Sequence, residues 1–213
     1  MYYTIDGSEP TENSLRYNSP FEVKKSTKLK IKAFKKDLRS SYTTTLFLEK
    51  LESIDPRKLR TKLKNGLSYK YYEGIFRSVY DFSQEDPIQK GEVSNINIES
   101  RLRDEWIGFE FDGFINIPKN GVYNFEISAN DGAQLLIDNK ELFESDGRKS
   151  FSFTQKNDII LSKGLHKFTI RYFQCSDNIG LKALWSGPGF KKTEIDTSYL
   201  YHMVDQNGDV SNP

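Results

Sequence analysis

The sequence is poor in the residues from which redox and metal sites are commonly built. Its 213 residues include one cysteine, two histidines and two methionines. The single cysteine, Cys175, excludes an internal disulfide and any cysteine metal cluster. It follows the apolar stretch "KFTIRYFQ", so we interpret it as a buried structural thiol. Neither His166 nor His202 has a spacing that indicates a nucleophilic pair with this cysteine.

Long apolar runs are absent as well. No run approaches the roughly 20 residues that a membrane-spanning helix requires, so we expect no membrane insertion. The chain opens with "MYYTIDG", which is already a strand pattern and not a signal peptide. Such a chain is either cytosolic or a piece of a longer secreted protein, and we favour the second.

Charge is balanced overall but divided along the chain. The net charge is +1, yet residues 1–64 hold 15 Lys/Arg against 8 Asp/Glu, a difference of +7, while residues 65–213 hold 16 against 22, a difference of −6. This split indicates two modules. Lys28, Lys30 and Lys32 alternate with apolar residues and are therefore one face of a strand. Basic residues are not interleaved with aromatic ones, so we expect no nucleic-acid partner.

Aromatic residues and period-two patterns are what the sequence has in quantity. Fifteen Phe and 12 Tyr favour strands and aromatic cores. The stretches "WIGFEFDGFINIP" and "GVYNFEISANDGAQLLIDNK" alternate apolar and polar residues, whereas no long amphipathic helix is found. The fold class is therefore all-β, an antiparallel β-sandwich of the jelly-roll or Greek-key type. Five apolar residues of one parity are predicted to share its core: Tyr123, Phe125, Ile127, Leu135 and Ile137.

Asn130 and Asp131 stand between two of these alternating runs. Asp131-Gly132 predicts a hairpin turn, because glycine accepts positive φ. The pair is then either turn chemistry alone or a binding site at the rim of the sandwich, and both alternatives stay open.

Four segments follow from the composition: a small β module over 1–48, a charged linker over 49–64, the sandwich over 65–203 and a tail over 204–213. In the linker, Asp55 before Pro56 is a favourable helix start, so we expect either a short helix or an extended connection. A second hairpin is predicted at Lys163-Gly164.

The first segment resembles a known module. "YYTIDGSEPT" and "YNSPFEVKKSTKLKIKAFK" are similar to the small immunoglobulin-like module at the C-terminal end of chitobiases and β-hexosaminidases. That module normally begins with two earlier strands, so the resemblance implies a smaller, truncated immunoglobulin-like β module here.

Residues from about 65 to 202 resemble the protective-antigen-type (PA fourteen) module. The similarity lies in "GFEFDGFINIPKNGVYNFEISANDGAQLLIDNKELF" and "IRYFQCSDNIGLKALWSGPG". Family members are β-sandwiches that occur in glycosidases, adhesins and toxins, and many bind glycans. The order of the two modules resembles the C-terminal end of envelope glycosidases such as family-twenty β-N-acetylhexosaminidases.

The resemblance also implies a calcium site. In sugar-binding members, two adjacent aspartates after the Tyr-x-Phe strand hold a calcium ion, often across a cis peptide, and the matching positions are Asn130 and Asp131. A second loop supplies further oxygens, matched here by Asp177 and Asn178. Asn130 departs from the family pattern and brings one negative charge less, although calcium accepts amide oxygens.

Trp106 and Phe114 lie on the polar parity of their strand. They are either an exposed platform for a sugar or residues that pack under a loop or against another module. We therefore expect a non-catalytic carbohydrate-binding accessory region of a secreted, periplasmic or cell-surface glycoside hydrolase, with a glycan or polysaccharide and an adjacent catalytic domain as partners. The alternative is a structural spacer or docking module without glycan binding. No acid motif in a cleft-forming context indicates that the chain is itself a hydrolase.

Overall fold

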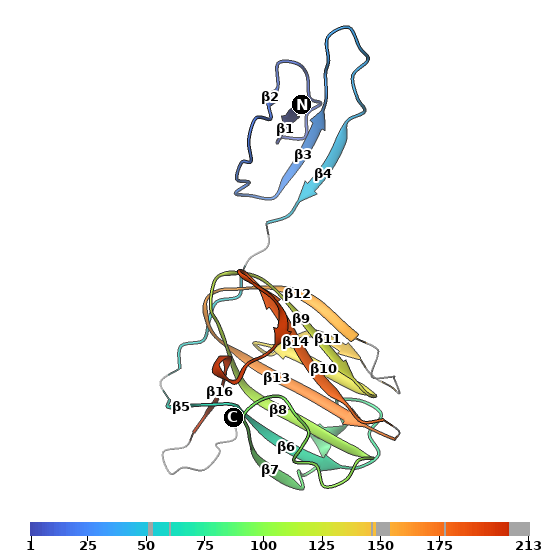
Figure 1. Ribbon diagram of the computed structural model, residues 1–213, viewed down its shortest axis with the longest axis vertical. Coiled ribbons are helices and arrows are strands. Elements are labelled where there is room, and N and C mark those ends of the chain that lie inside the picture. The colour runs from blue at the N-terminus through green and yellow to red at the C-terminus, as the bar shows by residue number, and fades with distance from the viewer. Residues whose placement is uncertain (51–52, 60, 146, 148–153, 177, 205–213) are drawn as a thin grey trace. The chain divides into compact units, whose positions relative to one another are not determined.

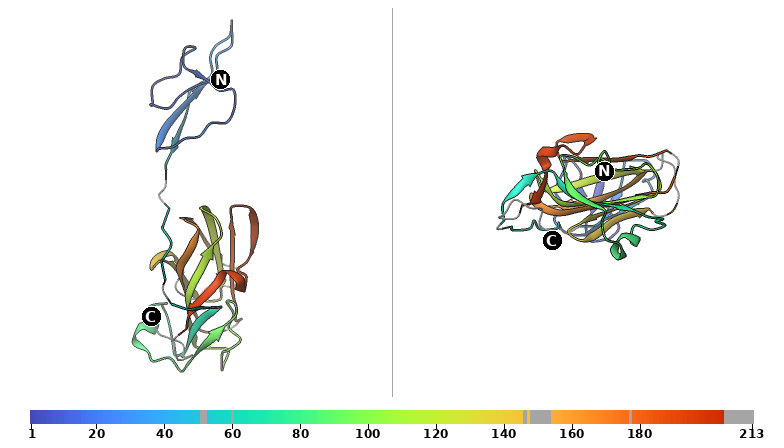
Figure 2. Two further views of the ribbon diagram at one scale, coloured as in Figure 1. Left: turned by 90° about the vertical axis from the view of Figure 1, so that its left-hand side faces the viewer. Right: turned by 90° about the horizontal axis from the view of Figure 1, so that it is seen from below.

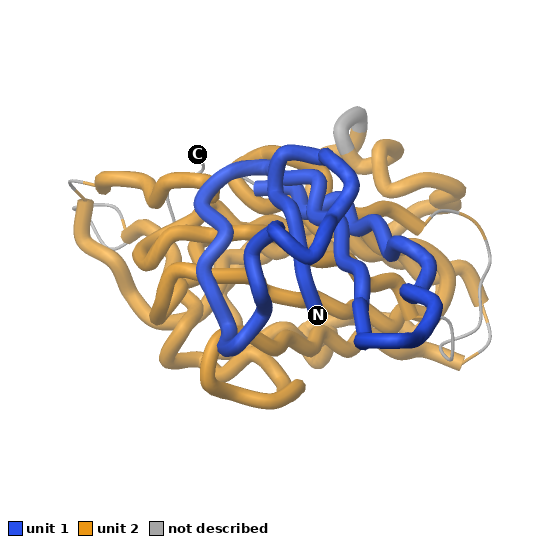
Figure 3. The backbone as a smooth tube through the Cα atoms, turned by 90° about the horizontal axis from the view of Figure 1, so that it is seen from above, with its two compact units in different colours: residues 1–52 blue, residues 53–213 orange. Residues whose placement is uncertain are grey.

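The computed structural model describes residues 1–50, 53–59, 61–145, 147, 154–176 and 178–204 (Figure 1). The chain divides into two compact units, residues 1–52 and 53–213 (Figure 3). Within the described residues, no helix is long and apolar enough to cross a membrane. Asp177 and the tail over 205–213 lie outside these residues, so the predictions that concern them stay predictions.

The first unit is a single antiparallel sheet. Its strand order is β2-β1-β3-β4, with the bounds β1 Tyr2–Thr4, β2 Leu15–Arg16, β3 Thr27–Lys32 and β4 Thr44–Leu48. Leu29 pairs with Leu46 between the antiparallel strands β3 and β4. Leu29 is buried, but Leu46, Tyr42 and Phe47 are exposed. A single layer therefore leaves much of its apolar surface in water.

The second unit is a two-layer sandwich of antiparallel sheets, which confirms the predicted class (Figures 1 and 2). The larger sheet has the order β11-β10-β13-β8-β16-β5, and β6 pairs with both β8 and β7. Its strands are β5 Leu63–Asn65, β6 Leu67–Glu73, β7 Gln89–Val93, β8 Ile107–Ile117, β10 Gly132–Ile137, β11 Lys140–Ser145, β13 Gly164–Gln174 and β16 Leu200–Met203.

The smaller sheet has the order β12-β9-β14-β15. Its strands are β9 Gly121–Ala129, β12 Thr154–Leu161, β14 Leu181–Gly187 and β15 Phe190–Glu194. Two short 3-10 helices, η1 Asp81–Gln84 and η2 Thr197–Tyr199, lie in connections of the same unit.

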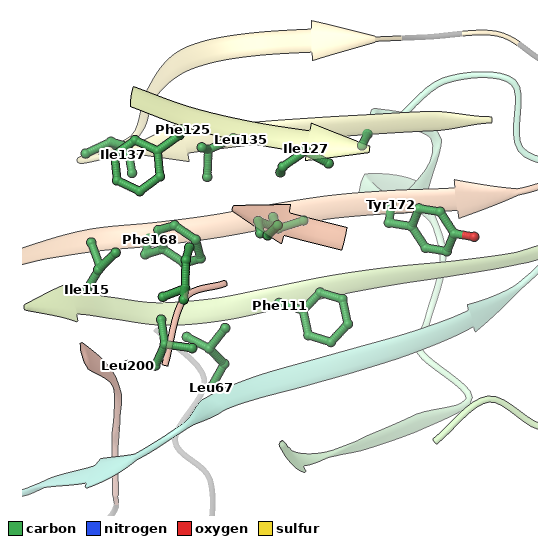
Figure 4. Close-up of a cluster of buried hydrophobic side chains, with 14 of the residues drawn as sticks. Leu67, Phe111, Ile115, Phe125, Ile127, Leu135, Ile137, Phe168, Tyr172 and Leu200 are labelled. Carbon is green, nitrogen blue, oxygen red and sulfur yellow. The ribbon is translucent and has the colours of Figure 1, made fainter. Parts of the chain in front are cut away.

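The core forms where the apolar parity of each sheet faces the other (Figure 4). Phe125 and Ile127 of β9 lie opposite Phe168 and Tyr172 of β13, and all four are buried. The five residues predicted to share this core are 0 to 2% exposed and belong to one cluster, which confirms the parity assignment. Alternation along the chain therefore correctly identifies the inner face of both sheets.

Two predicted hairpins are wrong, because the strands on either side belong to different sheets. β9 pairs with β12 and β14, whereas β10 pairs with β11 and β13. The step at Asp131-Gly132 thus crosses from one layer to the other, and so does the step at Lys163-Gly164 between β12 and β13. A true hairpin joins β10 to β11 through Asp138 and Asn139, whose φ values of 51° and 64° are those of a type I′ turn.

Residues 53–59 form an extended strap along the sandwich. Ile54 N donates to Ile160 O at 3.1 Å, Ser162 N donates to Ile54 O at 3.0 Å, and Arg57 N donates to Leu165 O at 2.7 Å. No helix begins at Asp55-Pro56 in this described stretch, so the helix alternative is wrong and the extended one holds. The physical reason is that hydrogen bonds to the β12–β13 corner replace those that a helix would make internally.

Candidate functional site

The crossover from β9 to β10 places Asn130 and Asp131 at the rim of the sandwich. Asn130 N donates to Gly180 O at 2.9 Å, and the Asp131 carboxylate Oδ2 accepts from Cys175 N at 2.6 Å. The two residues are only 7% and 5% exposed. Asp131 therefore ties the crossover to the end of β13 and does not cap a turn of its own.

Gly132 has a different role from the one predicted. The positive φ at this corner, 65°, belongs to Asp131, a residue type that tolerates it. Gly132 is needed because a Cβ there would lie 2.0 Å from the ring of Phe173. The glycine thus makes room for an aromatic ring of the neighbouring strand.

Trp106 lies beside the same corner. Its N donates to Cys175 O at 2.9 Å, and its carbonyl accepts from Gly74 N at 2.9 Å. Cys175 therefore has Asp131 bonded to its amide and Trp106 bonded to its carbonyl, so the structure brings these two predicted site residues together. Trp106 has φ 58°, which is a strained conformation for a bulky residue.

A cavity of about 450 Å³ opens next to Trp106. Its walls include Phe76, Phe173 and Cys175, with Ile75 and Arg77 from the segment after β6. This volume is in the usual range for small-ligand pockets, and an apolar wall with one cation suits a ligand with a flat apolar face and polar edges. Trp106 is half-buried, so part of its side chain faces this cavity.

Sequence reasoning did not find the contribution of residues 75–77 to this cavity. Phe76 packs with Tyr72 and Phe82 in a small cluster beside the main core. The signal is the aromatic-rich stretch "YYEGIFRSVYDF", which has no period because the chain leaves β6 at Glu73 and continues through bends, turns and a 3-10 helix. Turn-forming segments of this kind are placed by tertiary packing, which a pattern along the chain does not reveal.

Phe114 lies elsewhere and is not an exposed platform. It is 3% exposed, and Lys167 Nζ lies 5.4 Å from the centre of its ring. The prediction of an exposed Phe114 is therefore wrong, and the packed alternative holds. The reason is that the outer face of the larger sheet is itself covered at this position by side chains of neighbouring strands.

The rim offers oxygen ligands, but few. Asn130 Oδ1 and Asp131 Oδ1 have no hydrogen-bond partner among the described residues, and Asn178 is exposed. Within the same residues no three Asp, Glu, His or Cys side chains converge, and no peptide bond is cis. Two free side-chain oxygens fall short of the six to eight that calcium takes, so backbone, water or the neighbouring loop would have to supply the rest.

The sequence as a whole matches two family models. Residues 1–45 match the chitobiase/β-hexosaminidase C-terminal domain, and residues 63–199 match the PA14 domain. The chain belongs to the PA14 domain family. Both matched models describe accessory domains, and neither describes a catalytic domain. The module order is the one that the two sequence resemblances predict.

Individual relatives agree with this assignment. A β-hexosaminidase of Porphyromonas gingivalis is 29% identical over 178 residues, which is 78% of this chain and 22% of the relative. The chain thus spans about a fifth of that enzyme's length. The PA14 domain of the antifreeze protein MpAFP superposes with a TM-score of 0.57 at 16% identity, covering 74% of this chain and 98% of that domain.

A fungal adhesin has the same fold. The A domain of epithelial adhesin 9 from Candida glabrata, solved in complex with Galβ1-3GlcNAc, superposes with a TM-score of 0.53 at 13% identity. The match covers 70% of this chain and 94% of the adhesin domain. At such identities, the two solved structures establish a shared fold.

Proposed function

We propose that this chain is a non-catalytic carbohydrate-binding accessory region of a secreted or cell-surface glycoside hydrolase. The observation that carries the proposal is the cavity next to Trp106, which we call the rim cavity. Trp106, with its strained backbone, lies there beside apolar walls and Arg77. Membership of the PA14 family and the glycan complex of the adhesin support it. The β-hexosaminidase relative supports a hydrolase as the parent protein and hence an adjacent catalytic domain.

In this proposal the sugar ring lies against Trp106. The apolar C–H face of a pyranose packs on an aromatic ring, while its hydroxyl groups bond to polar groups at the edge of the pocket. Arg77 is the charged donor on the cavity wall. Hydrogen bonds on both sides of Trp106 hold its backbone in place, so little freedom remains to be lost when a ligand binds.

Calcium is part of the same proposal. Asn130 and Asp131 would hold the ion through their free Oδ1 atoms, with Asp177 and Asn178 as the predicted ligands of the second loop. A calcium ion at the rim would bind sugar hydroxyl groups directly. The expected result is a rise in thermal midpoint at millimolar calcium that disappears in Asp131→Ala. No shift in the unaltered protein would leave Asn130 and Asp131 with their corner-forming role alone.

Glycan binding can be tested by calorimetry on the whole chain with N-acetylglucosamine- and galactose-containing oligosaccharides. We expect Trp106→Ala and Arg77→Ala each to weaken binding by about fivefold to tenfold, the equivalent of an aromatic contact or one hydrogen bond. Tyr42→Ala is the matched control, since it removes an exposed aromatic ring from the first unit. Equal losses in all three variants, or no binding by the unaltered chain, would contradict the proposal.

A further inference from the structure

A second cavity, of about 410 Å³, lies on the outer face of the larger sheet. We call it the sheet groove. It is lined from β8 and β13 by Glu110, Asp112, Lys167 and Arg171, and from the strap by Arg57. The two cavities share no lining residue, although Arg171 of the sheet groove and Phe173 of the rim cavity are two positions apart on β13.

The floor of the sheet groove is a row of paired charges. Glu110 accepts from Lys70 Nζ at 3.1 Å and from Arg171 Nε at 2.8 Å. Asp112 accepts from Lys167 Nζ and from Thr169 Oγ1. Burial raises the pKa of Glu110, but Arg171 and Lys70 outweigh this effect and hold the pKa below its usual value. Both signs of charge are thus present at neutral pH.

Arg57 is fixed at the edge of the sheet groove by a buried network. Its Nε donates to Asp138 Oδ1 at 3.0 Å, and Asp138 Oδ2 lies 2.6 Å from His166 Nδ1. His166 is 0% exposed, and its Nε2 lies 2.8 Å from Ser162 O. Both partners of the imidazole, a carboxylate oxygen and a carbonyl oxygen, are hydrogen-bond acceptors. The carboxylate of Asp138 therefore lies between the imidazole of His166 and the guanidinium of Arg57, and it sets the direction of the guanidinium.

Several donors of the sheet groove are still available to a ligand. The two terminal nitrogens of Arg57 and the side-chain amide of Asn139 have no partner in the part of the chain that the structure describes. Arg171 uses Nε for Glu110 and one terminal nitrogen for Gln134 Oε1 at 3.3 Å, which leaves its other terminal nitrogen without a described partner. Leu136 and Met203 add an apolar wall.

This lining selects a particular kind of ligand. A simple anion would meet the carboxylates of Glu110 and Asp112, and a simple cation would meet Lys167 and Arg171. Hydroxyl groups can both donate to the carboxylates and accept from the cations. The free end of Arg57 is a two-pronged donor that matches one carboxylate. We propose that the sheet groove is a second saccharide site, specific for a sugar that carries a carboxylate.

The charge balance of the lining supports this choice. Arg57, Lys167 and Arg171 outnumber Glu110 and Asp112 by one, although residues 65–213 together have a net charge of −6. A locally cationic groove on an acidic region attracts an acidic sugar to this one place. The proposal is independent of the rim cavity and of the function proposed for it.

Calorimetry with trigalacturonate and its carboxylate-reduced counterpart, galactotriose, tests the proposal on the whole chain. We expect the unaltered protein to bind the acidic trisaccharide at least tenfold more tightly than the neutral one. Arg57→Gln should remove this preference, and Arg57→Lys should restore little of it, because a single ammonium cannot form the two-pronged contact. Arg39→Gln is the matched control, an exposed arginine of the first unit.

A second variant keeps the test valid if the loss of Arg57 weakens the fold. Asn139→Asp adds a negative charge at the mouth and retains a residue type that tolerates its φ of 64°. We expect it to weaken trigalacturonate binding at least threefold with an unchanged thermal midpoint. Equal binding of both trisaccharides, no binding of either, equally tight binding of a hexaglutamate peptide, or loss of binding in Trp106→Ala would each overturn the proposal.

Discussion

The two units use the same strand chemistry to different effect. In the first unit, Phe47 of β4 is 77% exposed, whereas Phe125 of β9 in the second unit is 1% exposed. Both phenylalanines lie on strands with large apolar side chains, although only β9 alternates them with polar ones, since Leu46, Phe47 and Leu48 are consecutive. The units also differ in a second layer: β9 packs against the larger sheet, whereas the described residues of the first unit form a single sheet. Apolar side chains on one face of a sheet are therefore buried only where a second sheet packs against that face.

The largest expected effect is the removal of a core ring from the layered unit. Phe125→Ala deletes a side chain that packs with Phe168 and Trp185, so we expect the free energy of unfolding to fall by about 3–5 kcal/mol. Urea denaturation, followed by tryptophan fluorescence, measures this change. A loss below about 1 kcal/mol would mean that the second unit does not depend on its layers as the comparison requires.

The second-largest effect is expected in the charged network under the strap, formed by Arg57, Asp138 and His166. Asp138→Asn removes the carboxylate that bonds to the buried His166, to Arg57 and to the Lys167 amide, and we expect a loss of about 3 kcal/mol at pH 7. Burial raises the pKa of Asp138, but hydrogen bonds from His166, the Lys167 amide and Arg57 lower it by more, so the pKa lies below the ordinary 3.8.

The sign of the pH dependence follows from that direction. A carboxyl with a lowered pKa stabilises the fold above its unfolded value and loses this contribution as the pH falls through the folded value. The unaltered protein should therefore lose stability below about pH 4, and Asp138→Asn should show a shallower acid branch. Urea midpoints between pH 3 and pH 7 measure both slopes. Parallel curves would show that the carboxylate does not act in this way.

The inner faces were predictable from the sequence because side-chain parity is a local property of a strand. Tyr123, Ile127 and Ile137 are buried where the alternation places them. The choice of partner strand is not local. β9 and β10 are consecutive and separated by two residues, which favours a hairpin, yet they belong to different sheets of the sandwich. No pattern within the segment distinguishes these outcomes.

The candidate site was only partly predictable for the same reason. Asp131 and Trp106 do meet at one end of the sandwich, but through the backbone of Cys175, and Asn130 bonds to Gly180 instead. The sheet groove was missed because Glu110, Asp112 and Arg171 are the expected polar parity of half-buried strands. Only the strap, which brings Arg57 to them from elsewhere in the chain, makes this surface a groove.

Replacing Gly132 tests whether this glycine serves a hairpin turn or makes room where the chain crosses from one sheet to the other. Gly132→Ala places a methyl group against the Phe173 ring, so we expect a loss of about 2 kcal/mol from overpacking. If Gly132 served only a turn, its replacement by alanine would lower the free energy of unfolding by about half as much. Val122→Ala, at an exposed position of β9, is the control and should change stability by less than about 0.5 kcal/mol.

The smallest expected effect lies in the single-layer unit. Phe47→Ala removes a ring that is mostly in water and that has Lys28 Nζ 5.3 Å from its centre. Little burial is lost, so we expect the first unit to lose less than about 1 kcal/mol, the usual range for an exposed cation–π contact. Hydrogen exchange of the β3–β4 amides measures the stability of this unit separately from that of the sandwich. A loss of 2 kcal/mol or more would mean that another surface covers Phe47 in solution, and the contrast between a bare layer and a layered core would no longer hold.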